Sequence, residues 1–125
     1  MNSKISMVLR IVLGLMLLVF GLNKFFNFLP APEGMSEEAG TYFGALMSTK
    51  TLTLVAIVEV VAGLTFLLNK YGALMAVILM SVSVNAVLFH ATLDSANIAP
   101  ALVLLVLNIV VLYGYKDKYK GLLAG

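Results

Sequence analysis

The sequence predicts an all-α, polytopic membrane protein, an antiparallel bundle of four transmembrane helices with a short amphipathic helix in the first outer loop. Three observations predict this class. Of 125 residues, 62% are hydrophobic and only 11% are charged, so a water-soluble fold would leave many apolar side chains in water. Four apolar stretches account for most of the chain. None shows the alternating pattern of a membrane barrel, which leaves the helix as the structure that satisfies its own backbone in lipid.

The four predicted spans cover about residues 5–29, 52–68, 73–90 and 98–115. Each has roughly 17–25 residues, which at about 1.5 Å per residue crosses a hydrocarbon core of about 30 Å. A chain of this length forms one domain, residues 1–125, and the short connections after the second and third spans make neighbouring helices antiparallel. Small residues are expected to let the backbones approach: Gly14, Gly21, Ala56, Gly63, Gly72 and Ala76.

The first span also has the charged start and apolar run of a secretory signal. The apolar run from Ile11 to Leu22 is followed by Asn23, Lys24 and two phenylalanines, with no small residues at the spacing of a cleavage site. We therefore expect an uncleaved helix. Six of the eight lysines and arginines fall on the side of the two termini and two on the other, so the positive-inside rule places both termini in the cytoplasm.

The longest polar connection, residues 30–50, contains an expected amphipathic helix at about 36–48. Ser36 is a suitable N-cap, Glu37 and Glu38 suit a first helical turn, and apolar residues then recur on one face. This segment is either a connector that rests on the outer surface or a lid over the mouth of the bundle.

Glu59 is the most informative polar residue, because it lies in the middle of the second span, where a lone carboxylate costs several kcal/mol. Arg10 and Lys24 share one stripe of the first span with Gly14 and Gly21. Lys24 is expected to approach Glu59 from the outer side and Arg10 from the inner side. The resulting ion pair either fixes the helix register or forms part of a functional site.

His90 is expected to end the third span at the outer side, on the same stripe as Ser83, and Asn85 lies on a different stripe. The His90 side chain either lies in the hydrated headgroup layer or takes up and releases protons. Asn108 in the fourth span is expected to form an interhelical hydrogen bond.

These residues resemble the DoxX family of four-helix membrane proteins over roughly residues 5–115. The resemblance implies a location in a bacterial or archaeal cytoplasmic (inner) membrane. The best-known relatives include the DoxD subunit, which is associated with a thiosulfate:quinone oxidoreductase, and DoxX proteins described as membrane partners of soluble redox or sulfur-handling enzymes, so a redox partner protein is possible here. The resemblance lies in three patterns and in His90, which closes the third span; the patterns are Leu9-Arg10-x-x-x-Gly14, Phe20-Gly21-x-x-Lys24-Phe25 and Glu59-x-x-x-Gly63-x-x-x-Leu67. Most of its weight comes from the arginine, the Gly-x-x-Lys and the glutamate of the second span.

Several chemistries are excluded or not expected. The chain has no cysteine, so it holds no thiol relay or iron–sulfur cluster, and one histidine cannot supply both axial ligands of a haem. No nucleotide motif, metal site or nucleic-acid surface is predicted. A redox role would need a lipid-soluble cofactor, most simply a quinone, or a partner protein.

The first hypothesis is therefore a membrane subunit of a quinone-linked or sulfur-linked oxidoreductase. Lys24, Glu59 and His90 are its candidate catalytic residues, and Lys24, Glu59 and Asn85 form its candidate pocket for a quinone or small anion. The second is a non-catalytic scaffold that docks a partner through Tyr42, Phe43 and Met47. A third, small-solute transport, would need a homo-oligomer, because four helices are few for a transport path.

Overall fold

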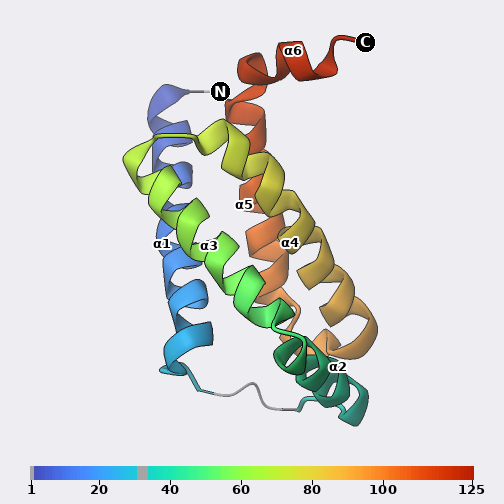
Figure 1. The fold of residues 1–125 in the computed structure, drawn as a ribbon. Coiled ribbons are helices and arrows are strands. Elements are labelled where there is room, and N and C mark those ends of the chain that lie inside the picture. Colours follow the sequence, from blue (N-terminus) through green and yellow to red (C-terminus); the bar gives the residue numbers. More distant parts are fainter. Residues whose placement is uncertain (1, 31–33) are drawn as a thin grey trace.

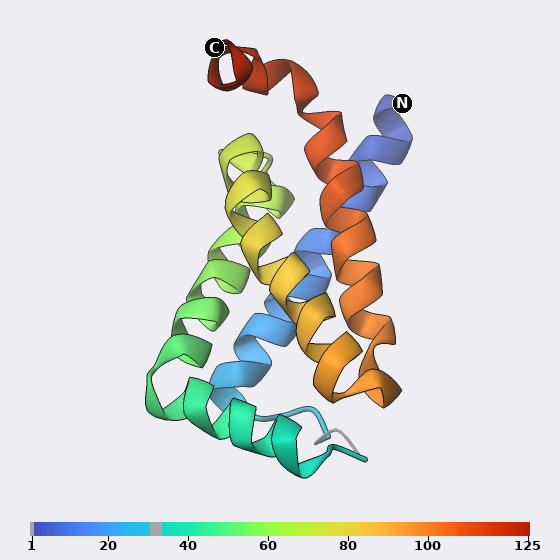
Figure 2. The same ribbon diagram turned by 90° about the vertical axis from the view of Figure 1, so that its right-hand side faces the viewer.

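The computed structural model describes residues 2–30 and 34–125, and every regular element in these ranges is helical. Four long helices, α1 (Ser3–Phe26), α3 (Thr51–Leu68), α4 (Gly72–Leu93) and α5 (Ala99–Gly114), lie beside one another and alternate in direction (Figure 1). The shorter α2 (Glu37–Ser48) lies across one end (Figure 2). Both termini lie at the opposite end (Figure 1).

Within the described ranges, α1, α3 and α4 are each long and apolar enough to cross a membrane. The 16-residue α5 reaches that standard only together with its continuation over Lys116–Leu123, from which it is bent by 72°. Large apolar side chains such as Leu54, Leu88 and Val106 are more than half exposed. Such an exterior matches a lipid environment rather than water.

Local capping explains where the helices differ from their predicted bounds. The first helix begins at Ser3 because Asn2 Oδ1 accepts a hydrogen bond from the Lys4 amide at 2.8 Å. It ends at Phe26, before the predicted residue 29, because Asn27 adopts the left-handed conformation and Pro30 follows. Residues 31–33 of the predicted outer loop lie outside the described ranges.

The amphipathic helix forms as α2, with Ser36 as its N-cap. Ser36 Oγ accepts from the Ala39 amide at 3.1 Å and donates to the Leu93 carbonyl at 2.8 Å. Ala39 is fully buried, and α2 contacts both α3 and α4. The helix is therefore packed over the end of the bundle.

The tail after α5 forms a short 3₁₀ helix, η2 (Lys116–Tyr119), and a single helical turn, α6 (Lys120–Leu123), which the sequence analysis did not predict. Two tyrosines hold this segment against the turn between α3 and α4 and against the first turn of α4. Tyr115 Oη donates to Asn69 Oδ1 at 2.6 Å, and Tyr119 Oη donates to the Ala73 carbonyl at 2.8 Å.

Small residues bring α1 and α3 together, as the sequence predicts. A Cβ added at Gly63 would lie 2.8 Å from the carbonyl oxygen of Gly14, and one added at Gly14 would lie 3.0 Å from the carbonyl oxygen of Gly63. At Gly21 an added Cβ would lie 3.2 Å from the carbonyl oxygen of Ala56. The α1–α3 interface thus depends on the absence of side chains at these points.

Replacing Gly63 by alanine is expected to lower the free energy of unfolding by about 1–3 kcal/mol, because the new methyl group meets backbone that must shift. Thermal unfolding in detergent measures the effect. Gly40→Ala on α2 is the matched control, since an added Cβ there meets nothing within 4 Å. A loss at position 40 as large as the loss at position 63 would contradict the close-contact explanation.

Candidate functional site

A cavity of about 350 Å³ lies beneath α2, between α1, α3, α4 and α5. We call it the outer cavity, after the side on which the charge rule places it. Its wall is mostly apolar, with a few polar side chains that converge from three different helices. The polar and aromatic residues that line it are Lys24, Tyr42, Phe43, Glu59, Ser81, Asn85, Phe89 and His90.

An ion pair forms one part of this wall. Lys24 Nζ lies 2.6 Å from Glu59 Oε1, and the exposed fractions of the two side chains are 23% and 3%. Among the described residues, the Lys24 ammonium is the only polar group in contact with Glu59 Oε1, and no other hydrogen-bond donor reaches this buried atom. The carboxylate therefore depends on a single cation for its stability in the bundle.

The α1–α3 interface places the two charges. Gly21 allows the helices to meet at Ala56 and Val60, and Lys24 follows one turn later, in the last turn of α1. A cation there also interacts favourably with the helix dipole. Glu59 lies eight residues into α3, about 12 Å from its start, so the lysine reaches it from the outer end.

Arg10 does not join this pair, contrary to the sequence expectation. Its Nη1 donates to the backbone carbonyl of Phe66 near the opposite end of α3. Arg10 does lie against α3, as its helical stripe predicts, but at a different level along the helix axis from Glu59. Glu59 and Phe66 are seven residues apart, about 10 Å, and the guanidinium binds the carbonyl nearer to it.

Asn85 and His90 both line the outer cavity, although the sequence placed them on different stripes of their helix. The face of α4 toward the cavity is two rows of side chains wide. Ser83, which was expected on the His90 stripe, turns away and donates to Asn108 Oδ1 at 2.7 Å. Asn85 is exposed, and its amide has no hydrogen-bond partner among the described residues.

His90 lies one turn before the end of α4, which continues to Leu93 beyond the predicted end. Its Nδ1 is 3.3 Å from Oδ2 of Asp94, a carboxylate that is only 4% exposed. Asn97 Nδ2 donates to both oxygens of this carboxylate, at 3.0 and 3.2 Å. This contact between His90 and Asp94 was not predicted, although their four-residue spacing is one at which side chains on a helix meet.

An aromatic cluster forms the part of the wall nearest α2. The Tyr42 ring stacks on Phe89 with centroids 5.2 Å apart, and the Phe43 ring meets Phe89 edge-on at 5.2 Å. The helical spacing had placed Tyr42 and Phe43 on one face of α2, but it gave no indication of their partner. Phe89, which is 8% exposed, joins α2 to α4.

Asn108 lies outside this cavity and forms the predicted interhelical hydrogen bonds. Its Nδ2 donates to the carbonyl of Ala76 at 3.0 Å, and its Oδ1 accepts from Ser83. All three residues are fully buried. Asn108 therefore holds α5 against α4.

The geometry brings Lys24, Glu59, Asn85 and His90 to one cavity and leaves Arg10 at the other end. A DoxX family model matches residues 5–92, which contain all five of these residues. The chain belongs to the DoxX family. The match ends before α5, whereas the resemblance had been extended to about residue 115. No curated protein and no solved structure matches this DoxX chain.

In this DoxX protein, replacing Lys24 by glutamine is expected to lower the free energy of unfolding more than replacing Glu59 by glutamine. The first change leaves a buried carboxylate without its counterion, at a cost of about 3–5 kcal/mol. The second leaves a lysine that can extend toward water. Chemical unfolding in detergent measures both variants.

Lys50→Gln is the control, because Lys50 is an exposed lysine outside the outer cavity. It should change stability by no more than about 0.5 kcal/mol. Equal losses in the Lys24 and Glu59 variants would show that burial of the carboxylate does not decide the stability of the pair.

Proposed function

We propose that this DoxX protein is a four-pass subunit of a quinone-linked oxidoreductase system in the cytoplasmic (inner) membrane, and that it holds a quinone ring in the outer cavity. The observation that carries the proposal is that the Lys24–Glu59 pair and the Asn85 amide, which has no partner among the described residues, converge in one mostly apolar cavity. A volume of about 350 Å³ lies within the usual range of ligand sites, about 300–1,000 Å³.

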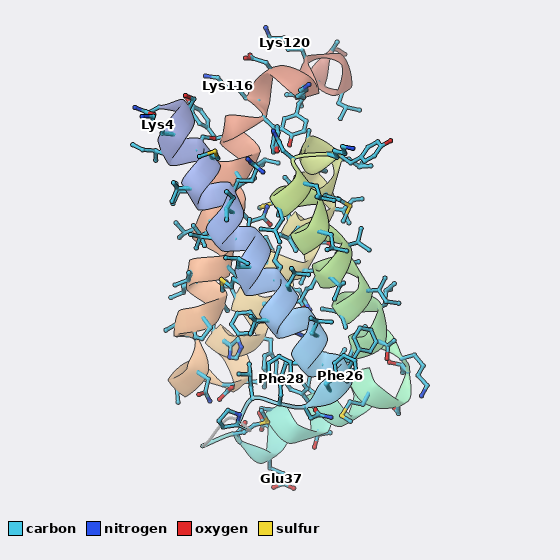
Figure 3. All side chains as sticks on the ribbon, turned by 90° about the vertical axis from the view of Figure 1, so that its left-hand side faces the viewer. Lys4, Phe26, Phe28, Glu37, Lys116 and Lys120 are labelled. Carbon is cyan, nitrogen blue, oxygen red and sulfur yellow. The ribbon has the colours of Figure 1, made fainter. Side chains whose placement is uncertain are left out.

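Two features support a fourth crossing by α5. Its 16 residues carry no charge, and it packs against two of the long helices, α4 and α1. Lys116, Lys118 and Lys120 follow it directly. Figure 3 shows Lys4, Lys116 and Lys120 at one end of the molecule and Glu37 at the other, an asymmetry that favours cytoplasmic termini.

The polar groups of the outer cavity suit a ring that carries carbonyl oxygens. The Lys24 ammonium and the Asn85 amide are hydrogen-bond donors on different helices, and Leu104, Val55 and Val58 supply apolar contact. A bound quinone would supply two-electron, two-proton redox chemistry. Electrons would have to come from a redox partner protein.

The chain's own residues can supply the protons and positive charge that this chemistry needs. Lys24 can donate a hydrogen bond to a ligand oxygen while it stays paired with Glu59, because its side chain lines the cavity. Glu59 holds or delivers a proton next to it. His90, which is 21% exposed and pairs with Asp94, provides exchange with water at the outer edge.

The alternatives have less support. A scaffold that docks a partner through Tyr42, Phe43 and Met47 would need these side chains to face outward, but the first two pack on Phe89 and only Met47 is largely exposed, at 61%. A transport path gains no support from α1, α3 and α4, which run without a break.

Asn85→Leu is expected to weaken binding of a short-chain benzoquinone about tenfold or more while leaving stability unchanged, because the amide bonds the ligand and no described protein group. Equilibrium binding to the purified full chain in detergent measures it. Thr92→Val is the control, an exposed polar position on α4 outside the cavity. Unchanged binding in Asn85→Leu would contradict the proposed site.

The topology can be tested separately, because the chain has no native cysteine. Single cysteines at Glu37 and Gly125 are expected to react with a membrane-impermeant thiol reagent from opposite sides of the membrane, since α3, α4 and α5 separate them. Cells and inverted vesicles provide the two sides. Labelling of both positions from the same side would mean that α5 does not cross.

A further inference from the structure

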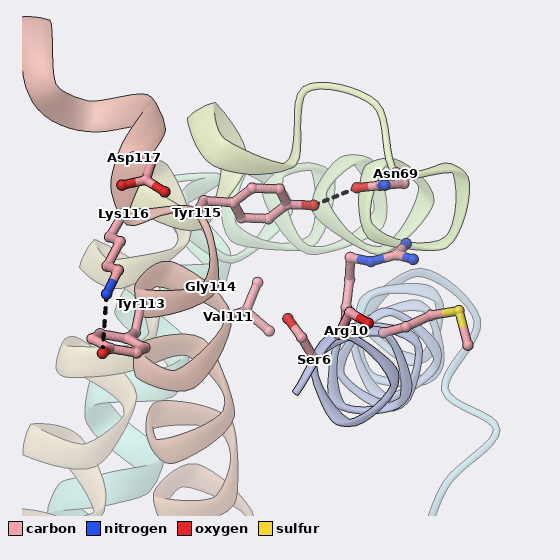
Figure 4. Close-up of a pocket in the computed structure, with 11 residues that line it drawn as sticks. Ser6, Arg10, Asn69, Val111, Tyr113, Gly114, Tyr115, Lys116 and Asp117 are labelled. Atoms are coloured by element: carbon pink, nitrogen blue, oxygen red, sulfur yellow. Dashed lines mark hydrogen bonds between the residues drawn. The ribbon is translucent and has the colours of Figure 1, made fainter. Parts of the chain in front are cut away.

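A second cavity, of about 400 Å³, lies at the end of the molecule that holds both termini. We call it the inner cavity. Its wall comes from the first turns of α1, the C-cap of α3, and the end of α5 with the residues that follow. Figure 4 shows Ser6 and Arg10 projecting from α1 toward the segment that carries Tyr115 and toward Asn69.

Arg10 is the main charge of this cavity. One of its N–H groups donates to the Phe66 carbonyl, and its other donors have no partner among the described residues. No carboxylate in the described ranges forms an ion pair with it. Asp117 lines the same cavity, but it is 80% exposed and its ion-pair partner is Lys120 at 3.7 Å. A half-buried guanidinium without a counterion favours an anion from outside the protein.

The other polar groups around Arg10 are also placed to donate. Several helical hydroxyls, such as those of Thr65 and Ser81, donate back to a carbonyl of their own helix. The half-buried Ser6 hydroxyl makes no such bond among the described residues, so it can donate to a ligand. Asn69 Oδ1 is occupied by Tyr115 Oη at 2.6 Å, which leaves the Asn69 amide nitrogen as a donor.

Electrostatics at the rim agree with this pattern. Lys116 Nζ donates to Tyr113 Oη at 3.2 Å, and this hydrogen bond raises the pKa of the Lys116 ammonium above its usual value, so it remains charged. Burial raises the pKa of the Tyr115 hydroxyl, and nearby Arg10 opposes that rise only in part, so the phenol stays neutral. With Arg10 and Lys116 against Asp117, the inner cavity carries a net positive charge.

We propose that the inner cavity is a binding site for a tetrahedral oxyanion of the phosphate type, held by Arg10 with Ser6 and Asn69 as further donors. The planar guanidinium fork suits two oxygens of such a group at once. The anion has two sources with the same chemistry, the headgroup of an acidic phospholipid in the inner leaflet and a free anion from the cytoplasm. This site uses none of the residues proposed to bind quinone.

Two measurements on the full chain separate the sources. Native mass spectrometry after exposure to equal amounts of phosphatidylglycerol and phosphatidylcholine reports retention of an acidic headgroup. The shift of thermal unfolding with inorganic phosphate, at an ionic strength held constant with sodium chloride, reports a free anion. Retention of the acidic lipid supports the membrane source, and a phosphate-dependent shift supports the soluble source. Each result counts in favour of the site only if Arg10→Gln reduces it.

Arg10→Gln is expected to weaken binding of whichever probe the unmodified chain binds, phosphatidylglycerol or phosphate, by about tenfold or more. The reason is that the change removes charge-assisted hydrogen bonds. Lys4→Gln is the matched control, since it removes one positive charge from the same helix end outside the cavity, and it should change binding less than about twofold. Equal weakening in both variants would overturn the proposal, because it would indicate diffuse surface charge. Unchanged binding in Arg10→Gln in both measurements would also overturn it.

A milder variant covers the case in which Arg10→Gln fails to fold after losing its bond to Phe66. Ser6→Ala removes one neutral donor and should weaken binding by about two- to tenfold. Ser48→Ala, whose hydroxyl donates to the Ala45 carbonyl on α2, serves as its control and should bind as the unmodified chain does. Identical binding in Ser6→Ala and Ser48→Ala would remove Ser6 from the site, and with an unfolded Arg10→Gln it would overturn the proposal.

Discussion

Contact between the backbones of α1 and α3 at Gly14 and Gly63 sets the geometry of both cavities. The distance it fixes lets Lys24 reach Glu59 at one end and Arg10 reach the Phe66 carbonyl at the other. A wider separation would require water or longer side chains to satisfy these groups. In a membrane, where hydrophobic association between helices is weak, such close packing and the polar contacts it permits hold the bundle together.

Two different kinds of interaction attach the remaining helices to this core. Asn108 holds α5 on α4 through the Ala76 carbonyl and Ser83, while Phe89 holds α2 on α4 through the two aromatic rings. The Asn108 contacts are polar and buried in the middle of the bundle, whereas the Phe89 contacts are apolar and lie at its end. Polar groups in lipid must be satisfied within the protein, whereas the end of the bundle can use aromatic surface that also meets the headgroup region.

The sequence predicted the helical class, three of the membrane-spanning helices, the amphipathic helix and the α1–α3 contact, because each depends on a local pattern of apolar, small or capping residues. The first span was predicted to end at about residue 29, but α1 ends at Phe26. Asn23 contributes to this difference, because its side-chain oxygen accepts a hydrogen bond from the Leu29 amide and stabilises the chain as it leaves the helix. The destination of Arg10 and the pairing of Phe89 with α2 were not predictable. Both depend on the axial offset and rotation between helices, which periodicity within one helix does not determine.

Charge distinguishes the two cavities more sharply than size does, since their volumes are about 350 and 400 Å³. In the outer cavity the ammonium of Lys24 is balanced by Glu59, so a charged ligand would have to break that pair, whereas a neutral ring with polar oxygens leaves it in place. In the inner cavity Arg10 has no such internal counterion among the described residues. The same helix pair therefore borders a largely apolar cavity with a balanced ion pair at one end and a cationic cavity at the other, and this difference in charge is the physical basis for proposing two different classes of ligand.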